Sequence, residues 1–325
     1  MIYGQDKAIE QFLTAWGSGA MHHAWLLAGP RGVGKARFAH AAAQRVLAEA
    51  AGPPIDAPGL DTPEDHPTGR LVAAGSHPDY RFLERVENKS GTALARSISV
   101  DQVRSLAELF AVTPALSPWR AVVIDSVDDL EASAANALLK MLEEPPANCL
   151  FLLVSHVPGR LLPTIRSRCR RLEFQTLDDD AMTSVLASEA PGLGASDRDR
   201  ILPLARGSVG RALAYAALDL APLEELALAI LRHGDRDNAR RSKLAQSLGA
   251  KAAADRYAAF LDMAPALIAI EARQLDGSAR RRALDAYSRA RETSRLAPRL
   301  SLDPAATVFQ LGSILASVAP QGPPR

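Results

Sequence analysis

The chain has 325 residues, of which 47% are hydrophobic and 5% aromatic, and its formal net charge is +1. This length predicts about two domains, or three if some are small. Near neutrality excludes proteins that coat nucleic acid through overall charge alone. The two cysteines, Cys149 and Cys169, are too few for a disulfide framework or a four-cysteine zinc site. Because no apolar run approaches about 20 residues and no signal peptide opens the chain, we expect a soluble, cytoplasmic protein.

A glycine-rich loop follows the first predicted strand. Residues 6–16 have the amphipathic pattern of a short helix, and the apolar run 24–28 predicts a buried strand. The next segment, GPRGVGKA, contains Gly29, Gly32, Gly34 and Lys35. Because an alanine-rich helical stretch follows, the pattern predicts a phosphate cradle of backbone N–H groups with the lysine as a point charge. The alternative is a tight turn that keeps its glycines for steric reasons.

Two positions that a P-loop ATPase needs are changed. Ala36 stands where the pattern has a Ser or Thr whose hydroxyl binds Mg²⁺. The apolar run 121–124 predicts a buried strand that delivers Asp125 to a sheet edge. Ser126 then stands where ATPases of this kind place a water-orienting Glu. We therefore expect that no cofactor is required and that ATP or ADP, if it binds, is not hydrolysed.

The segment between these motifs is less informative. Residues 51–69 are rich in Pro, Gly and Asp, which predicts a surface loop or a mobile insertion. His66 and His77 are metal ligands or structural residues, and the lack of cysteine partners favours the structural role. Strands are expected at 80–83 and 98–100, the second leading to a helix capped by Asp101.

An arginine-rich turn closes the central stretch of the chain. A helical pattern from about Leu130 ends at Pro145-Pro146, and the apolar run 150–154 predicts another buried strand. Five arginines lie between Arg160 and Arg171. This concentration of positive charge beyond a sheet edge favours a meeting point with a nucleotide, held by this chain or by a neighbour.

The chain beyond residue 174 has the pattern of helices only. Three short helices are expected at 178–186, 196–205 and 209–218, and longer ones from about 221 to 318. The last helix has Asp303 as its expected N-cap and Pro304 at its first position. Arginine runs after Asp235 and across residues 280–299 predict a solvated helix face, or alternatively a subunit seam or a rim that attracts nucleic acid.

Five segments together resemble the AAA+ clamp-loader subunits of bacterial DNA polymerase III, with the delta-prime subunits as the nearest group. They are HHAWLLAGPRGVGK, GSHPD, NALLKMLEEPP, TIRSRC and GSVGRAL, and they span residues 22–213. The resemblance implies an α/β plus all-α fold. A P-loop domain with a doubly wound parallel sheet would cover residues 1–175, a three-helix lid 176–219 and a helical collar 220–325.

The resemblance also implies partners and residue roles. The partners are the gamma/tau and delta subunits of a pentameric ring, with the sliding clamp and primed DNA reached through the complex and no membrane. Arg168 would be an arginine finger that acts in trans on the ATP of a neighbouring subunit, and the alternative is an internal ion pair. Ser155 and Arg211 fall at the two sensor positions of the family. Relatives carry a four-cysteine zinc module that this sequence lacks, so we expect no zinc and no other metal.

These observations predict a stator-like, delta-prime-type clamp-loader subunit that lacks ATPase activity of its own. One alternative is an active motor subunit of the gamma/tau type, which Ala36 and Ser126 disfavour. Another is a P-loop nucleotide kinase, which would not carry NALLKMLEEPP and SRC. A freestanding DNA-binding protein is disfavoured by the near-neutral charge.

Overall fold

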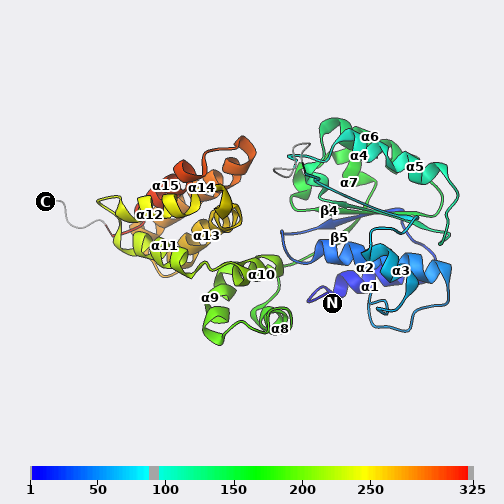
Figure 1. The fold of residues 1–325 in the computed structure, drawn as a ribbon, viewed down its shortest axis with the longest axis horizontal. Coiled ribbons are helices and arrows are strands. Elements are labelled where there is room, and N and C mark those ends of the chain that lie inside the picture. The colour runs from blue at the N-terminus through cyan, green and yellow to red at the C-terminus, as the bar shows by residue number, and fades with distance from the viewer. Residues whose placement is uncertain (1, 88–94, 321–325) are drawn as a thin grey trace. The chain divides into compact units, whose positions relative to one another are not determined.

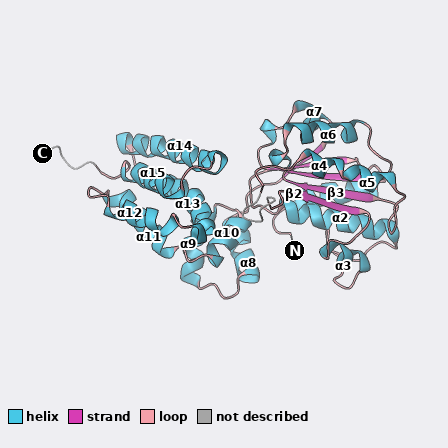
Figure 2. Cartoon of the chain, turned by 45° about the horizontal axis from the view of Figure 1, so that its top comes forward, coloured by secondary structure: helices cyan, strands magenta, loops and turns pink. Residues whose placement is uncertain are grey.

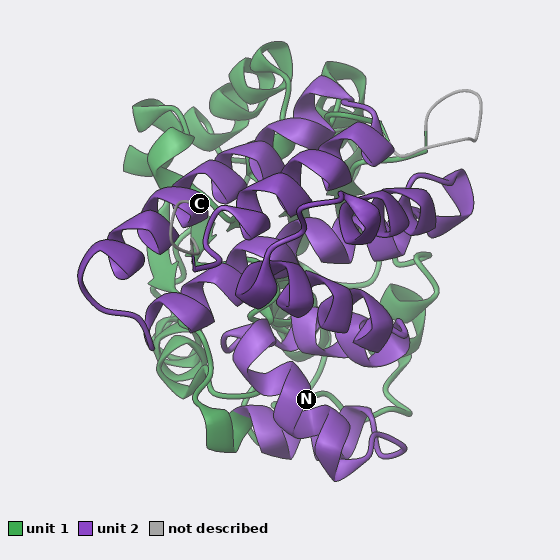
Figure 3. Cartoon of the chain, turned by 90° about the vertical axis from the view of Figure 1, so that its left-hand side faces the viewer, with its two compact units in different colours: residues 1–181 green, residues 182–325 purple. Residues whose placement is uncertain are grey.

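The computed structural model describes residues 2–87 and 95–320, which form two compact units. The first unit covers residues 1–181 and the second residues 182–325 (Figure 3). The first combines strands with helices, and the second contains helices in its described part (Figures 1 and 2).

A parallel five-stranded sheet forms the centre of the first unit, in the order β2-β3-β4-β1-β5. The strands are β1 (Ala24–Ala28), β2 (Tyr80–Glu84), β3 (Arg120–Asp125), β4 (Cys149–Ser155) and β5 (Arg170–Glu173). β1, β3 and β4 correspond to the predicted apolar runs. β1 and β4 are buried along their whole length, as is typical of strands covered on both faces.

Helices cover both faces of this sheet (Figure 1). One face carries α1 (Asp6–Gly17), α2 (Lys35–Ala51) and α3 (Pro67–Ala73). The other carries α4 (Val100–Arg104), α5 (Leu106–Ala111), α6 (Ala132–Glu143) and α7 (Pro163–Ser167). Two short 3-10 turns, Val127–Asp129 and Pro158–Arg160, follow β3 and β4.

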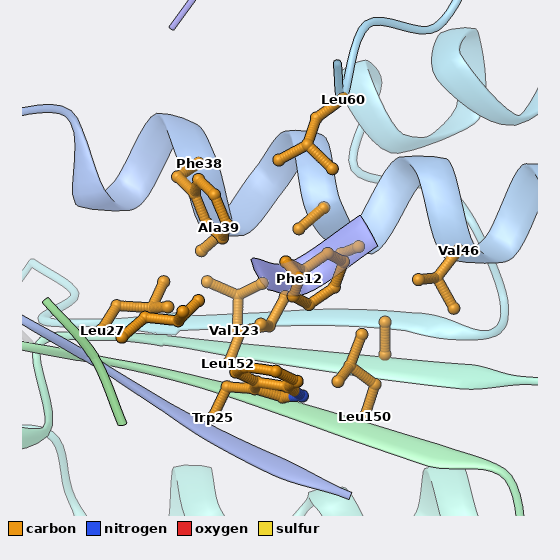
Figure 4. Packing of buried hydrophobic residues seen from close by; sticks show 14 of the residues in the cluster. Phe12, Trp25, Leu27, Phe38, Ala39, Val46, Leu60, Val123, Leu150 and Leu152 are labelled. Carbon is orange, nitrogen blue, oxygen red and sulfur yellow. The ribbon is translucent and has the colours of Figure 1, made fainter. Parts of the chain in front are cut away.

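Aromatic side chains lock the α1–α2 face onto the sheet (Figure 4). The ring of Phe12 packs against those of Trp25 and Phe38, with centroids 5.3 and 5.7 Å apart. All three side chains are fully buried. Because alternate residues of a strand face opposite sides, Trp25 and Leu27 point toward this core and Leu26 toward the other.

Two local expectations are wrong. Residues 98–100 do not form a strand: Ile98 makes an isolated bridge with Leu130, and α4 begins at Val100. The N-cap is Ser99, whose hydroxyl and Gln102 form a capping box. Two β-branched apolar residues, Ile98 and Val100, on either side of Ser99 looked like a strand, but the reciprocal cap places the start of the helix upstream of Asp101.

The segment expected to be a surface loop or a mobile insertion is a loop that α2 holds in place. The Arg45 guanidinium on α2 donates to the carbonyl oxygens of Ile55, Ala57 and Asp61, at 2.6, 3.3 and 2.7 Å. Leu60 is 2% exposed, and the end of the segment enters α3. Pro and Gly content correctly excluded regular structure over most of the segment, but a single arginine binds three of its backbone oxygens.

The second unit consists of consecutive helices. They are α8 (Asp179–Glu189, whose start lies in the first unit), α9 (Ala195–Ala205), α10 (Val209–Ala217), α11 (Ala221–His233), α12 (Ala239–Leu248), a 3-10 turn (Lys251–Ala253), α13 (Ala254–Ala272), α14 (Gly277–Leu300) and α15 (Pro304–Ala316). The predicted start of the last helix is confirmed, since the Asp303 carboxylate accepts from the Ala306 N–H at 2.8 Å.

The predicted fold class is confirmed: a doubly wound α/β unit is followed by a helical unit. The boundary between the compact units falls after Ala181, and α8 to α15 belong together from there. The division of this helical part into a lid at 176–219 and a collar at 220–325 stays a prediction. Among the described residues, none of the helices is both long and apolar enough to span a membrane.

Candidate functional site

The carboxyl ends of three strands meet at one edge of the sheet. Ala28 pairs with Ser155 in the β1–β4 register, and Asp125 pairs with Val154 in the β3–β4 register. The loops that leave these strands therefore start side by side. Ligands of open parallel α/β sheets bind at this edge. The structure thus brings together the glycine loop, Asp125 and Ser155, as the sequence predicted for one site.

The glycine loop has positions that only glycine fills. A Cβ on Gly29 would lie 2.2 Å from the carbonyl oxygen of Phe174, just after β5. Gly34 has φ +97° and is the N-cap of α2. The left-handed region is strained for residues with a side chain. These glycines are required by the backbone itself, which fits both a phosphate cradle and a tight turn.

The ammonium group of Lys35 is engaged by the loop. Its Nζ donates to the carbonyl oxygen of Gly29 at 2.7 Å and also to that of Pro30. The side chain is buried, and burial lowers the pKa of Lys35 to about 8, against the opposing effect of the Asp125 and Asp128 carboxylates. These two contacts use two of the three N–H donors of the ammonium group and leave one for a phosphate oxygen.

The residues beside the loop do not fit magnesium-dependent hydrolysis. Ala36 presents a methyl group where a hydroxyl ligand is needed. The Ser126 hydroxyl donates to Asp128 Oδ2 at 2.8 Å, and no carboxylate replaces it at that position. Burial raises the pKa of Asp125, although the positive charge of Lys35 opposes the shift. The structure therefore places Lys35 and Asp125 beside the glycine loop, with a methyl group at position 36 and a hydroxyl group at position 126.

Asp128 organises this edge, and the sequence analysis did not single it out. Its carboxylate accepts from the Ser155 hydroxyl at 3.0 Å and from the backbone N–H groups of His156 and Val157. The residue lies in the 3-10 turn after β3, three positions beyond Asp125. The DSVD spacing was the available signal. Ser155, at the predicted sensor position, is therefore bound to a carboxylate of its own chain.

His156 is a second residue that the sequence analysis missed. Burial and the nearby charges of Lys35 and Arg31 lower the pKa of His156 to about 4, so its ring is neutral at pH 7. Its Nδ1 is buried and has no hydrogen-bond partner in the described structure. The CLFLLVSH run ended on this histidine, but only three-dimensional proximity to Lys35 makes it part of the site.

Arg168 lies at the end of α7 and forms an ion pair within its own chain. Its Nη2 lies 2.7 Å from Glu143 Oε1 at the end of α6, and its Nη1 donates to the Thr164 carbonyl oxygen at 2.9 Å. The two charged side chains are 33% and 47% exposed. Partly exposed pairs of this kind contribute about 0–1 kcal/mol. The internal ion pair foreseen as the alternative is present, yet it is weak enough to be exchanged for another anion.

Arg211, at the second predicted sensor position, belongs to the second unit. Arg211 lies on helix α10, which begins at Val209. Ser208 caps this helix, since its Oγ accepts from the Arg211 N–H at 3.3 Å. The guanidinium donates to the Ala205 carbonyl oxygen at 3.2 Å, and its Nε lies 3.7 Å from an Asp262 carboxylate oxygen. These contacts join the predicted lid stretch to α13.

The GSHPD segment is a structural anchor. The Asp79 carboxylate accepts from the N–H groups of Ala115, Leu116 and Ser117 at 2.7–2.9 Å. Burial acts to raise the pKa of Asp79, but these hydrogen bonds outweigh it and the pKa is lowered. The ring of His77 accepts from the Asp79 N–H at 3.1 Å. His66, the other histidine weighed as a ligand, likewise accepts from a backbone N–H, at the start of α3.

No group of three or more His, Cys, Asp or Glu side chains within residues 2–87 and 95–320 has the arrangement of a metal site. The expectation that the chain needs no zinc and no cofactor stays a prediction.

Comparison with known proteins identifies a protein family that matches the first unit. A profile of the family described as "DNA polymerase III, delta subunit" matches residues 4–178, more than half of the chain. The delta' subunit of Pseudomonas aeruginosa DNA polymerase III is 37% identical over 211 residues, which cover 64% of this chain and 59% of that protein. The match therefore spans about three-fifths of that relative's length.

Two further relatives are also named as subunits of bacterial DNA polymerase III. The Escherichia coli delta' subunit is 32% identical over 211 residues, covering 63% of this chain and 58% of its own. The tau subunit of Bacillus subtilis is 30% identical over 181 residues, covering 56% of this chain and 30% of its own. A solved gamma-subunit-related protein of Thermotoga maritima aligns with 94% of this chain and 98% of its own, at 16% identity and a TM-score of 0.46.

Proposed function

Because the chain belongs to the DNA polymerase III delta-subunit family, we propose that it is a delta-prime-type, stator-like subunit of a bacterial clamp loader. In this role it occupies one position of a cytoplasmic pentameric ring with gamma/tau and delta subunits. The ring opens the sliding clamp and places it on primed DNA. The named relatives support this choice, since delta' subunits of two bacteria are among them.

The state of the glycine loop carries the non-motor assignment. Lys35 donates to two loop carbonyl groups, and Ala36 supplies no hydroxyl for Mg²⁺. An active gamma/tau-type motor needs both groups for phosphoryl transfer. A nucleotide bound here would remain unhydrolysed, which is the property of a subunit that holds the geometry of the ring.

Arg168 supplies the chemical contribution of this chain to its neighbour. The guanidinium is permanently charged and presents a planar fork suited to phosphate oxygens. It extends from the turn between α7 and β5, where the preceding strand β4 and following strand β5 fix its position. Exchange of the Glu143 carboxylate for a γ-phosphate of the adjacent subunit would turn the internal ion pair into an arginine finger in trans.

The first experiment measures steady-state ATP hydrolysis by the purified chain with Mg²⁺, with and without primed DNA. We expect background rates. Turnover that disappears in the Lys35→Ala variant would establish a working active site and overturn the stator assignment.

The second experiment tests the finger in the assembled ring. Arg168→Ala should leave assembly intact and lower the clamp- and DNA-stimulated ATPase by about an order of magnitude or more, since arginine fingers contribute about 10³–10⁵ at the upper end. Arg166→Ala is the matched control, because Arg166 is exposed on the same helix. Unchanged stimulated ATPase with Arg168→Ala in an intact ring would contradict the trans role.

A further inference from the structure

One helix of the chain carries a large net positive charge. α14 contains seven arginines, no lysine and two carboxylates, and so carries a net charge of +5. Since the whole chain carries +1, the other 301 residues together carry −4. The near-neutral total that disfavoured nucleic-acid binding by overall charge therefore conceals a strongly basic segment.

The arginines of α14 are separated from its packing face. The buried positions are all alanines, namely Ala283, Ala286, Ala290 and Ala297. These small side chains let α14 lie against α13 and α15 (Figure 2). Six arginines are exposed: Arg280, Arg281, Arg289, Arg291, Arg295 and Arg299. On a helix with 100° per residue, Arg281, Arg295 and Arg299 fall within about 40° of one line, opposite the alanines.

These guanidinium groups are not neutralised by the chain itself. Within the part of the chain that the structure describes, none of the ion pairs involves an arginine of α14. This holds although Asp285 and Glu292 lie on the same helix. A solvated face usually interleaves its charges into i,i+4 pairs. The structure instead leaves the positive charges open to an external anion.

A pocket interrupts this basic face. It has a volume of about 320 Å³ and is lined by Tyr287, Ser288, Arg291, Glu292 and Arg295. The Arg291 guanidinium lies 5.6 Å from the centre of the Tyr287 ring. Hydrogen bonds from Arg206 and Arg291, together with their charges, lower the pKa of Tyr287 even though burial acts to raise it. Arg206, at the end of α9, thus adds a further exposed cation to the same cluster.

We propose that the exposed face of α14, with the arginine–tyrosine pocket at Tyr287, binds the phosphate backbone of nucleic acid. From Arg281 to Arg299 the helix rises about 27 Å, the length of about eight nucleotides of one strand. Exclusive use of arginine suits bidentate contact with phosphate oxygens. The tyrosine offers a flat surface on which a base of an unpaired strand can stack.

Nucleic acid suits this surface better than an acidic protein does. A regular row of phosphates matches arginines spread over the length of a helix, whereas a protein seam needs apolar area at its core. The exposed stripe of α14 offers few apolar side chains for such a core, namely Leu284 and Leu300.

The test measures binding of the full-length chain alone to a fluorescein-labelled 30-nucleotide oligo-dT strand by anisotropy between 50 and 200 mM salt. A triple variant, Arg281→Gln/Arg295→Gln/Arg299→Gln, is compared with the control variant Arg70→Gln/Arg236→Gln/Lys251→Gln. Both remove three exposed positive charges. Thermal unfolding of the three proteins verifies the fold, since exposed substitutions of this kind change stability by about 0.5 kcal/mol or less each.

The α14 variant should bind at least about tenfold more weakly, and the slope of log K against log salt should fall by about two, since each single-strand phosphate contact contributes about 0.7. The control variant should stay within about twofold of the natural chain. Equal weakening by both triples, no binding by the natural chain, or equal competition by polyglutamate of matched charge would each overturn the proposal. The last outcome would assign the face to an acidic protein instead. Because the assay uses the chain alone, its result does not depend on the proposed role in a ring.

Discussion

Arg168 and Glu143 join the turn before β5 to the end of α6 through an ion pair of 2.7 Å. The pair connects the two most specific segments of the sequence, SRC and NALLKMLEEPP. It gives Arg168 an anionic partner within the chain, and both side chains remain partly exposed. A structural role of Arg168 in this ion pair and a role of Arg168 in trans therefore predict different effects of substituting the two residues.

Replacement of Glu143 by Gln separates these roles. If Arg168 acts on a neighbour's ATP, Glu143→Gln frees it, and the stimulated ATPase of the reconstituted ring should stay at or above the natural level while Arg168→Ala lowers it. The cost in unfolding free energy should stay below about 1 kcal/mol, since both side chains of the pair are partly exposed. Urea unfolding and ATPase assays measure the two quantities, with Glu144→Gln as the neighbouring control. Equal loss of ATPase in Glu143→Gln and Arg168→Ala would assign Arg168 to the internal pair.

Lys35 predicts an unusual pH dependence of stability. Its folded pKa is about 8 and the ordinary value is 10.5, so between these values the unfolded chain binds more protons than the folded chain. Stability rises with pH wherever the unfolded state binds more protons, so this lysine contributes increasing stability from about pH 8 to 10.5. Urea unfolding of the natural chain and Lys35→Met across this window should give a difference that grows with pH in favour of the natural chain. A difference independent of pH would show that Lys35 titrates normally.

The sequence predicted the frame of this site better than its contacts. Apolar runs bounded by glycine, Asp125 and proline identified β1, β3 and β4, because a buried parallel strand leaves a continuous hydrophobic signal. The shared sheet edge then followed from parallel topology. Side-chain partners could not be predicted in this way. The contact of Asp128 with Ser155 joins residues 27 positions apart, and no local pattern specifies it.

Two features outside this site also depend on side-chain contacts that the sequence does not specify. Arg45 anchors the segment beyond α2 through backbone oxygens, which have no residue signature. The basic face of α14 was visible as an arginine run, but its alternatives could not be separated from sequence. Only the structure establishes that the alanines are buried and that the described carboxylates leave these arginines unpaired.

Asp79 predicts a loss of stability in acid. Its folded pKa is lowered from 3.8, so the three backbone hydrogen bonds stabilise the fold above the unfolded pKa, and this contribution disappears as pH falls through the lower folded pKa. Asp79→Asn should cost about 1–3 kcal/mol at pH 7, because buried N–H groups lose charged acceptors. The difference from the natural chain should shrink below pH 4. Asp65→Asn, at an exposed position, is the control. A constant difference from pH 7 to pH 3 would contradict the role of the ionised carboxylate.

Gly29 is the position where the glycine loop and the last strand approach most closely. Phe174 donates its N–H to the Ala28 carbonyl oxygen at 2.8 Å, and its own carbonyl oxygen then lies 2.2 Å from where a Cβ on Gly29 would be. Because both partners are backbone, neither can move without breaking the β1–β5 pairing. Gly29→Ala should therefore destabilise the chain by about 3 kcal/mol or more, the upper part of the range for overpacking.

Gly19→Ala is the matched control for backbone strain. Gly19 has φ +70° and nothing within 4 Å of its added Cβ, so its substitution adds the conformational cost alone, about 1 kcal/mol. Urea unfolding of both variants isolates the contribution of the close approach. A Gly29→Ala chain as stable as Gly19→Ala would show that the loop has room to shift away from β5. In that case the close approach to Phe174 would not be the reason for a glycine at position 29.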